Sequence, residues 1–292
     1  MANIELLVTV ASWEERFILG LKHLLDESSP RQLLMYYFED YADRTIDNRT
    51  YINELCQEKG VILESHSLSF KEPKQAWTTI YDTLKVDRLV EKEIIIDFTT
   101  MPREILWTIL NLLDGSSAVI NYVYSKPEKY NGIWLSRDPG KPRFVYKLGG
   151  EAKLGAKTLL LVITGYDAER VEQLVRFFDP HHSLLGIQVG NQYNNLGMNM
   201  SKYKQYERQS SFTLFEMDAY SADHGFAVIE TQLGKYLNDY NIIMSSLGPK
   251  PSAIALYRLK IKYPQTSLAY APSNEYNSEY SLGFGGNCSG KL

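Results

Sequence analysis

Cysteine is scarce in this chain, with only Cys56 and Cys288 among 292 residues. They lie far apart and outside any CxxC or Cys/His spacing, so the sequence supports neither a disulfide framework nor a zinc site. No apolar run approaches the roughly 18 residues of a membrane span, and the apolar stretch 4–10 follows no basic cluster as a signal peptide would. We therefore expect no membrane attachment and a reducing cytoplasm as the location.

The chain also lacks a large excess of positive or negative charge, since its formal net charge is only −4. A chain without a global basic field is not expected to wrap nucleic acid independently of sequence. Walker A and GxSxG sequences are absent, and the glycines at 283–286 do not follow a strand, so no dinucleotide fingerprint is present. No metal and no cofactor is predicted. Hydrophobic residues at 44% and charged residues at 23% are ordinary for a globular protein.

The strongest feature that is present is an internal duplication. The stretch 93–107 has a short apolar run, then hydroxyl residues, then proline with a cation, then an apolar helical pattern, and the stretch 241–255 repeats this order. Pro102-Arg103 and Pro249-Lys250 are 147 residues apart, as are Thr99 and Ser246. Each copy predicts a buried parallel strand, a tight hydroxyl-bearing loop and the start of a helix.

Strands alternate with helices throughout both copies, which predicts an α/β fold with parallel sheets covered on both faces. We expect two tandem Rossmann-like units related by internal duplication, the first at 1–131 and the second at 157–292. The correspondence weakens between 190 and 210, where a short helix is predicted at 202–208. Between the units, residues 132–156 are predicted to form a basic β-hairpin around Asp138-Pro139-Gly140.

The strand-to-loop junctions are the candidate binding positions, because ligands of open parallel sheets bind outside the carboxyl ends of the strands. A helix start there directs backbone N–H groups and the positive end of the helix dipole at an anion. We expect the loops of both units to line one cleft. The predicted ligand-binding residues are Thr9, Ser12, Asp97, Thr99, Thr100, Arg103, Thr164, Ser245, Ser246, Lys250, Tyr130 and Tyr276.

Some of these residues have alternative interpretations. The hydroxyl residues could simply cap helices, and Asp97 could be a structural residue that holds its loop, a general base or a metal ligand. A hydrolase triad drawn from Asp218, Ser221 and His224 is disfavoured, because Asp223 is more simply a helix cap. No catalytic residue is predicted, and whether the protein is an enzyme is left open.

Each half resembles the CRISPR-associated Rossmann fold domains of prokaryotic defence systems. In that family the fourth strand ends in a motif of the type Asp-x-Thr-Gly-Gly-Thr-Lys/Arg, and two domains join about a dyad to hold a cyclic oligonucleotide. Asp97-Phe-Thr-Thr-Met-Pro-Arg103 stands in that place here, and Met244-Ser-Ser-Leu-Gly-Pro-Lys250 stands in the duplicate. The paired glycines are absent, and Met244 replaces the acidic residue.

The resemblance and the loops give three hypotheses. The first is a ligand-sensing protein of antiviral defence that binds a nucleotide-type or other phosphorylated ligand, with Tyr130 and Tyr276 stacked on bases. The second is a phosphodiesterase of the ring-nuclease kind that cleaves this ligand. The third is a non-enzymatic interaction subunit with a protein partner in a multi-component system. The ligand, its turnover, the oligomeric state and the partners do not follow from the sequence.

Overall fold

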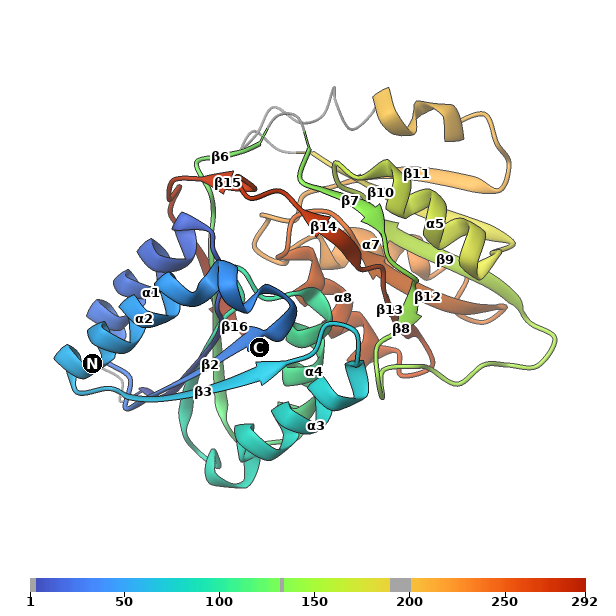
Figure 1. Ribbon diagram of the computed structural model, residues 1–292. Coiled ribbons are helices and arrows are strands. Elements are labelled where there is room, and N and C mark those ends of the chain that lie inside the picture. Colours follow the sequence, from blue (N-terminus) through green and yellow to red (C-terminus); the bar gives the residue numbers. More distant parts are fainter. Residues whose placement is uncertain (1–3, 132–133, 190–200) are drawn as a thin grey trace. The chain divides into compact units, whose positions relative to one another are not determined.

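The computed structural model describes residues 4–131, 134–189 and 201–292 (Figure 1). The chain splits into two compact units. The first comprises Met1–Ile133 and Ser278–Leu292, and the second comprises Trp134–Asn277. Within the described ranges, each unit is built on a mainly parallel sheet with helices on its faces, as the sequence predicted.

The first unit alternates strands and helices along most of its length. Its elements are β1 (Ile4–Val10), α1 (Glu15–Ser28), β2 (Gln32–Phe38), a 3-10 turn (Glu39–Tyr41), α2 (Ala42–Lys59), β3 (Ile62–Leu68), α3 (Pro73–Leu84), a 3-10 turn (Val86–Arg88), β4 (Glu93–Asp97), α4 (Arg103–Leu113), β5 (Val119–Ser125), β6 (Lys129–Tyr130), β15 (Ser281–Leu282) and β16 (Asn287–Lys291). Gly60, at a φ of 67°, ends α2 in the left-handed conformation that favours glycine, and Pro73 opens α3.

The sheet of the first unit has the order β16-β5-β4-β1-β2-β3. Strands β1 to β5 are parallel, and β16 is antiparallel to β5. Helices α1 and α2 pack on one face, where Phe17, Leu21 and Ile52 meet Leu7 and Leu33 in a buried core. Helices α3 and α4 cover the opposite face (Figure 1). Burial on both faces explains the near-continuous apolar runs of β1 and β4.

The second unit repeats this alternation. Its elements are β7 (Ser136–Pro139), β8 (Arg143–Phe144), β9 (Lys157–Ile163), α5 (Ala168–Phe178), β10 (His182–Gln188), a 3-10 turn (Lys204–Tyr206), β11 (Phe212–Met217), α7 (Phe226–Leu233), β12 (Tyr240–Ser246), α8 (Ser252–Lys262), β13 (Ser267–Tyr270) and β14 (Ser273–Tyr276). The predicted helix at 202–208 is a short helical stretch at 201–203 followed by this 3-10 turn, and residues 190–200 of the unaligned stretch lie outside the described residues.

The sheet of the second unit has the order β11-β10-β9-β12-β13-β8. Read from β11, this matches the first unit strand for strand, because β9 to β13 correspond to β1 to β5. Both sheets also end in an antiparallel sixth strand, β16 in one and β8 in the other. The duplication predicted from the sequence is therefore present in the strand order itself.

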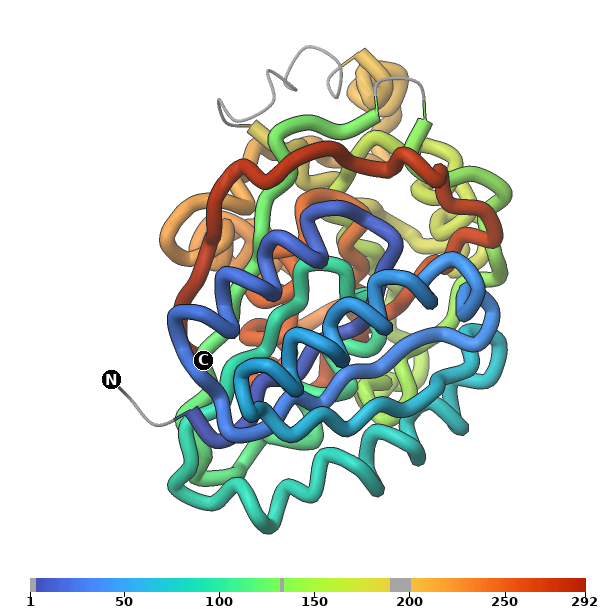
Figure 2. The backbone as a smooth tube through the Cα atoms, turned by 60° about the vertical axis from the view of Figure 1, so that its left-hand side comes forward, coloured from blue at the N-terminus to red at the C-terminus, as the bar shows by residue number. Residues whose placement is uncertain are grey.

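Two parts of the predicted organisation differ in the structure. The hairpin expected at 132–156 does not pair with itself, because β7 pairs with β14 and β8 pairs with β13. The chain also returns to the first unit at Ser278, where β15 pairs with β6 and β16 pairs with β5 (Figure 2). In both cases a segment far away in the sequence satisfies an exposed strand edge, which local patterns do not predict.

Candidate functional site

The winding of the first sheet reverses between β1 and β4. From β1 the chain moves to β2 and β3, and it then crosses back to β4 and β5 on the other side. The loops that follow β1 and β4 therefore start side by side at the carboxyl edge, and the Thr100 hydroxyl joins them by donating to the Val10 carbonyl at 2.7 Å. Such a reversal is where open α/β sheets bind ligands.

Asp97 is buried beneath this reversal and is surrounded by donors. Its Oδ2 accepts from the Thr9 hydroxyl at 2.8 Å, and its Oδ1 accepts from the Thr99 amide at 3.0 Å and from the Thr99 hydroxyl. The Thr99 hydroxyl in turn accepts from the Ser125 amide at 2.8 Å. Thr9, Asp97 and Thr99 are each at most 1% exposed. These three side chains form a hydrogen-bonded network that ties the ends of β1, β4 and β5 together.

The remaining candidates of the first unit lie nearer the surface of this edge. Thr100 and Arg103 are half-buried, and Arg103 is the first residue of α4. Ser12 is buried, and its hydroxyl accepts from the Glu14 amide at 3.2 Å. The backbone carbonyl of Ser12 accepts from the Asn48 side chain at 2.7 Å, so the loop after β1 is held by α2 as well as by Thr100.

The corresponding loops of the second unit are in direct backbone contact. A Cβ on Gly165 would lie 2.2 Å from the Leu247 carbonyl oxygen, and one on Gly248 would lie 2.5 Å from that of Thr164. The amides of Leu247 and Gly248 both donate to the Ile163 carbonyl. These contacts require glycine at both positions, because any side chain would separate the two loops.

The hydroxyl candidates of the second unit are buried at this edge. Thr164 donates to the Gly186 carbonyl at 2.9 Å, and Ser246 shares a 2.7 Å hydrogen bond with Ser252. The Ser245 hydroxyl is buried and has no hydrogen-bond partner within the described residues.

The strand pairing corrects the constant register of 147 residues inferred from the sequence. Ala11 and Thr164 make equivalent amide bonds at the ends of β1 and β9, and from them the sheet register aligns Asp97 with Ser245 rather than with Met244. The residue before each helix is Pro102 in α4 and Pro251 in α8.

Arg103 is therefore equivalent to Ser252, and Lys250 lies in a longer turn before α8. A shift of one residue in a strand exchanges its two faces, so the matched letters did not mark matched positions.

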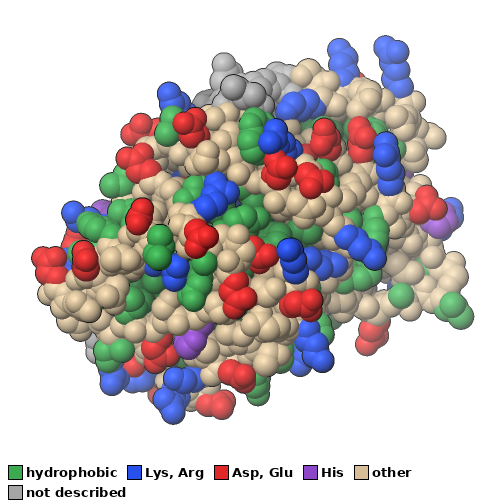
Figure 3. Space-filling model, in the orientation of Figure 1, with side chains coloured by type: hydrophobic (Ala, Val, Ile, Leu, Met, Phe, Trp, Pro, Cys, Tyr) green, Lys and Arg blue, Asp and Glu red, His purple; other side chains and the backbone are tan. Residues whose placement is uncertain are grey.

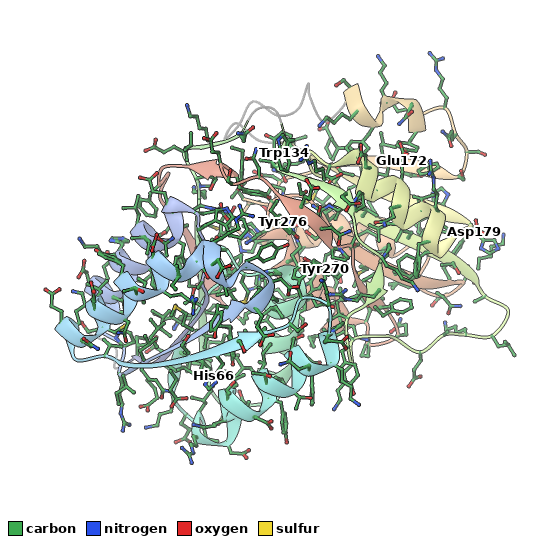
Figure 4. All side chains as sticks on the ribbon, in the orientation of Figure 1. His66, Trp134, Glu172, Asp179, Tyr270 and Tyr276 are labelled. Carbon is green, nitrogen blue, oxygen red and sulfur yellow. The ribbon has the colours of Figure 1, made fainter. Side chains whose placement is uncertain are left out.

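The two candidate stacking tyrosines lie beyond β5 and β13. The Tyr130 hydroxyl shares a 2.8 Å hydrogen bond with the Tyr124 hydroxyl, and its ring packs edge-on against Tyr280. Tyr276 ends β14 and pairs with Ser136 in the two-stranded sheet that β14 forms with β7. Figure 4 labels Tyr276 and also Trp134, which precedes β7 in the chain. Both rings are half-buried.

A buried arginine in each unit was not found by sequence reasoning. Arg16, at the start of α1, donates to Glu14 at 2.9 Å, to the Tyr124 hydroxyl and to the Ser125 carbonyl. Arg170, at the start of α5, donates to Asp167 at 2.9 Å and to the Ala271 carbonyl. Both clamp the first helix to the end of the fifth strand. The sequence pattern that could have revealed these arginines is an acidic residue two or three positions before an arginine, just after the first strand of each unit: Glu14 before Arg16, and Asp167 before Arg170.

Burial and ion pairing act in opposite directions on the Arg16 guanidinium. Desolvation by itself lowers the pKa of this group, but electrostatic interactions with the Glu14 carboxylate and with the phenol groups of Tyr124 and Tyr130 outweigh it, so the pKa lies well above its ordinary value. The guanidinium is therefore charged at every accessible pH. A buried charge that is paired and hydrogen-bonded fixes the local arrangement, since removal of one partner leaves the other uncompensated.

The cluster at 218–224 is a folded loop rather than a triad. The Ser221 hydroxyl donates to Asp223, and Asp223 accepts from the Ala227 amide in the first turn of α7 at 2.9 Å, although the N-cap residue of that helix is Gly225 rather than Asp223. The His224 ring bonds the Ala219 carbonyl through Nδ1 and does not bond to Ser221. Desolvation lowers the pKa of His224, so the ring is neutral near pH 7.

Neither the charges on the face shown in Figure 3 nor metal ligands among the described residues mark another site. Basic and acidic side chains are interspersed on the face shown in Figure 3. Among the residues described, no three His, Cys, Asp or Glu side chains are grouped closely enough to hold a metal ion. Over the same residues, no helix is both long and apolar enough to cross a membrane.

Comparison with known proteins gives a likeness of fold. No protein-family model matches the chain, and no curated protein does. The solved structure of a type III CRISPR defence DNA nuclease activated by cyclic oligoadenylate is similar, with a TM-score of 0.52 and 10% sequence identity. The match covers 87% of this chain and 63% of the nuclease chain. This chain therefore spans less than two thirds of the nuclease.

Two further structural matches have lower TM-scores. A putative universal stress protein from Pseudomonas aeruginosa UCBPP-PA14 matches at a TM-score of 0.30 and 8% identity, over 91% of this chain and 92% of that one. The cytoplasmic domain of a prokaryotic cation chloride cotransporter matches at 0.29 and 11%, over 94% and 98%. These two do not bear on the fold. The chain is an α/β protein of two tandem Rossmann-like units.

Proposed function

We propose that this protein is a sensor of prokaryotic defence that binds a nucleotide-type or other phosphorylated ligand at the carboxyl edges of its sheets. The observation that carries the proposal is the repeated reversal of winding, between β1 and β4 in one unit and between β9 and β12 in the other. Because both units have this reversal at the carboxyl edge of the sheet, the protein offers two similar edges, which suits a ligand with repeated phosphate groups.

The edge of the first unit has the chemistry that a phosphate needs. Helix α4 begins directly after the loop from β4, so the positive end of its dipole is at this edge. Arg103 on its first turn supplies a planar cation that suits phosphate oxygens. The network around Asp97 fixes the loop in advance, which lowers the entropic cost of binding.

The edge of the second unit differs in its donors. Pro249 and Pro251 lack amide hydrogens, and the Ser252 and Ala253 amides donate to carbonyls of the preceding turn. Lys250, half-buried in that turn, would supply the charge instead of an arginine. We therefore expect the first unit to contribute more to affinity than the second. The single cleft expected from the duplication stays a prediction.

The likeness of fold narrows the ligand class to be tested. The similar nuclease is activated by cyclic oligoadenylate, which is a ring of nucleotides joined by phosphodiesters. We propose a ligand of this class for the present chain, on the strength of the fold and the phosphate-binding chemistry of the first unit together.

Calorimetry with cyclic tri-, tetra- and hexa-adenylate, the linear forms and inorganic phosphate tests the proposal, with mass spectrometry of each mixture. Binding with the ligand recovered intact is the expected result. Shortened products would make the protein a phosphodiesterase acting on the same ligand class. No heat and no thermal shift with any compound would overturn the proposal and favour an interaction subunit with a protein partner.

A further inference from the structure

Besides the proposed phosphate site between β4 and α4, the carboxyl edge of the first unit carries a row of aromatic side chains. Trp13 follows β1, Tyr41 follows β2 and Phe70 follows β3. The ring centroids of Trp13 and Tyr41 are 5.5 Å apart, and those of Tyr41 and Phe70 are 6.2 Å apart. Aromatic contacts at these distances stabilise one another, and here they follow three neighbouring strands at the carboxyl edge, starting at the reversal next to β1.

Arg44 lies over one end of this row. Its guanidinium carbon is 3.7 Å from the centroid of the Trp13 ring and 5.9 Å from that of Tyr41. Arg44 is an exposed residue of α2, and Trp13 is half-buried. A guanidinium held against an indole is a flat, charged surface, and arginine planes and aromatic rings are the two surfaces on which proteins stack nucleobases.

The indole N–H of Trp13 provides a second indication of a ligand. The nitrogen is buried, and it has no hydrogen-bond acceptor within the described residues. A buried donor without an acceptor is rare in native proteins and is destabilising. A ligand heteroatom that accepts this hydrogen bond would remove that cost.

The same arrangement recurs at the equivalent place in the second unit. Tyr166 follows β9 as Trp13 follows β1, and the Lys202 ammonium lies 5.6 Å from the centroid of the Tyr166 ring. Lys202 also donates to the Tyr166 carbonyl. An aromatic residue after the first strand, with a cation from the helical segment after the second strand over its ring, is thus a feature of both copies. Lysine has no plane, so the first unit has the better stacking surface.

The loop after β1, which carries Trp13, is tied both to the loop between β4 and α4 and to helix α2. Thr100 bonds the Val10 carbonyl at one end of the loop after β1, and Asn48 of α2 bonds the Ser12 carbonyl at the other. Trp13 is three positions after Val10, so their Cα atoms are at most about 11 Å apart even when the loop is fully extended. A phosphate at the start of α4 and a base on Trp13 can therefore belong to one nucleotide.

We propose that Trp13, Tyr41 and Arg44 form a subsite that stacks the planar base of a nucleotide-type ligand. This inference rests on the proposed function and adds the part of the ligand that is recognised besides phosphate. A purine, which has the larger ring, is expected to bind more tightly than a pyrimidine.

Calorimetry and tryptophan fluorescence with 5′-AMP, 5′-CMP and ribose 5-phosphate test the subsite. We expect 5′-AMP to bind about tenfold to 100-fold more tightly than ribose 5-phosphate, since one stacked base contributes in this range. Trp13→Leu should reduce 5′-AMP affinity to that of ribose 5-phosphate, and Trp13→Phe should keep part of the difference. Binding of 5′-AMP should quench the tryptophan fluorescence of the wild type, and Trp13→Phe should remove this quenching.

Arg44→Ala and Arg44→Lys keep the test independent of folding, because the residue is exposed. Both should lower 5′-AMP affinity, since lysine restores the charge but not the plane. Tyr81→Leu is the matched control, as Tyr81 stacks on Trp77 and is 56% exposed on α3. It should leave 5′-AMP binding unchanged.

Equal binding of 5′-AMP and ribose 5-phosphate, unaffected by Trp13 and Arg44 variants, would overturn the subsite and leave the proposed phosphate site standing. No binding of any of the three compounds, together with no response to the cyclic oligoadenylates, would overturn both proposals.

Discussion

Thr9 donates its hydroxyl proton to Asp97 at 2.8 Å, and this bond joins the carboxyl ends of the two strands between which the winding of the first sheet reverses. Both residues are buried. The bond shows how hydroxyl and carboxyl groups that look like ligand-binding groups in the sequence are used to fix the loops that surround a ligand.

Asp97→Ala should therefore act mainly on stability. It would leave the Thr9 hydroxyl and both Thr99 donors without their acceptor, which should lower the free energy of unfolding by about 3 kcal/mol. Urea denaturation measures the change. Thr9→Val, which removes one of these donors, should cost about 1 kcal/mol. An Asp97→Ala protein of unchanged stability that no longer binds ligand would show that Asp97 contacts ligand directly.

Arg16→Met should also be strongly destabilising, because it leaves the Glu14 carboxylate, whose side chain is only 10% exposed, without its cation. The expected loss is about 3 to 5 kcal/mol in urea denaturation. The double variant Arg16→Met with Glu14→Gln should be more stable than Arg16→Met alone. Arg176→Met, which breaks the exposed pair with Glu172, is the control and should change little. If the two arginine variants behaved alike, the buried pair would not be the clamp described.

Gly165→Ala tests the backbone contact at the reversal in the second unit. Its Cβ would lie 2.2 Å from the Leu247 carbonyl oxygen, so the loops must separate, at an expected cost of about 1 to 3 kcal/mol. Gly149→Ala is the control, because its Cβ would meet nothing within 4 Å. Equal melting temperatures for the two variants would mean that the loops do not abut.

His224 should make stability depend on pH. Desolvation lowers its pKa in the folded protein, so between the folded pKa and the ordinary value of about 6.5 the unfolded chain binds a proton that the folded protein does not. The stabilisation is complete above pH 6.5 and is lost as the pH falls below it. Urea denaturation at pH 7.5 and pH 5.5 measures this loss.

His224→Asn should reduce the loss, since asparagine tolerates the φ of 59° at this position. It should not remove the loss, because burial lowers the pKa of His182 in the same direction. A variant that loses as much stability as the wild type would exclude His224 as a source.

Arg103→Ala should weaken cyclic tetra-adenylate binding more than Lys250→Ala does. Arg103 begins α4 at the reversal, whereas Lys250 lies in a turn two residues before α8. Charge-assisted bonds to phosphate contribute about 1.5 to 3 kcal/mol, so about tenfold or more is expected for Arg103. Calorimetry gives the affinities, and melting temperatures should stay close to that of the wild type. If Arg103→Ala binds normally, the phosphate lies elsewhere.

Much of the fold could be predicted from the sequence because strands and helices depend on the spacing of apolar residues over short stretches of chain. The apolar runs of β1, β4, β9 and β12 and the periodic helices between them gave parallel sheets in two copies. The positions of the candidate residues at strand ends followed from the same patterns. The equivalence of Arg103 and Lys250 did not hold, because the matched letters are one residue out of register at the strand and the turn before α8 is one residue longer than that before α4.

The sequence by itself determined that an α/β module occurs twice and where its strands meet its loops, because the periodicity of side chains depends on neighbours a few residues apart. Only the tertiary structure decided that Asp97 and Thr99 are enclosed in a network, that Arg16 and Arg170 are buried, and that β16 completes the first sheet. Those outcomes depend on contacts between residues separated by tens to hundreds of positions, and no local pattern records them.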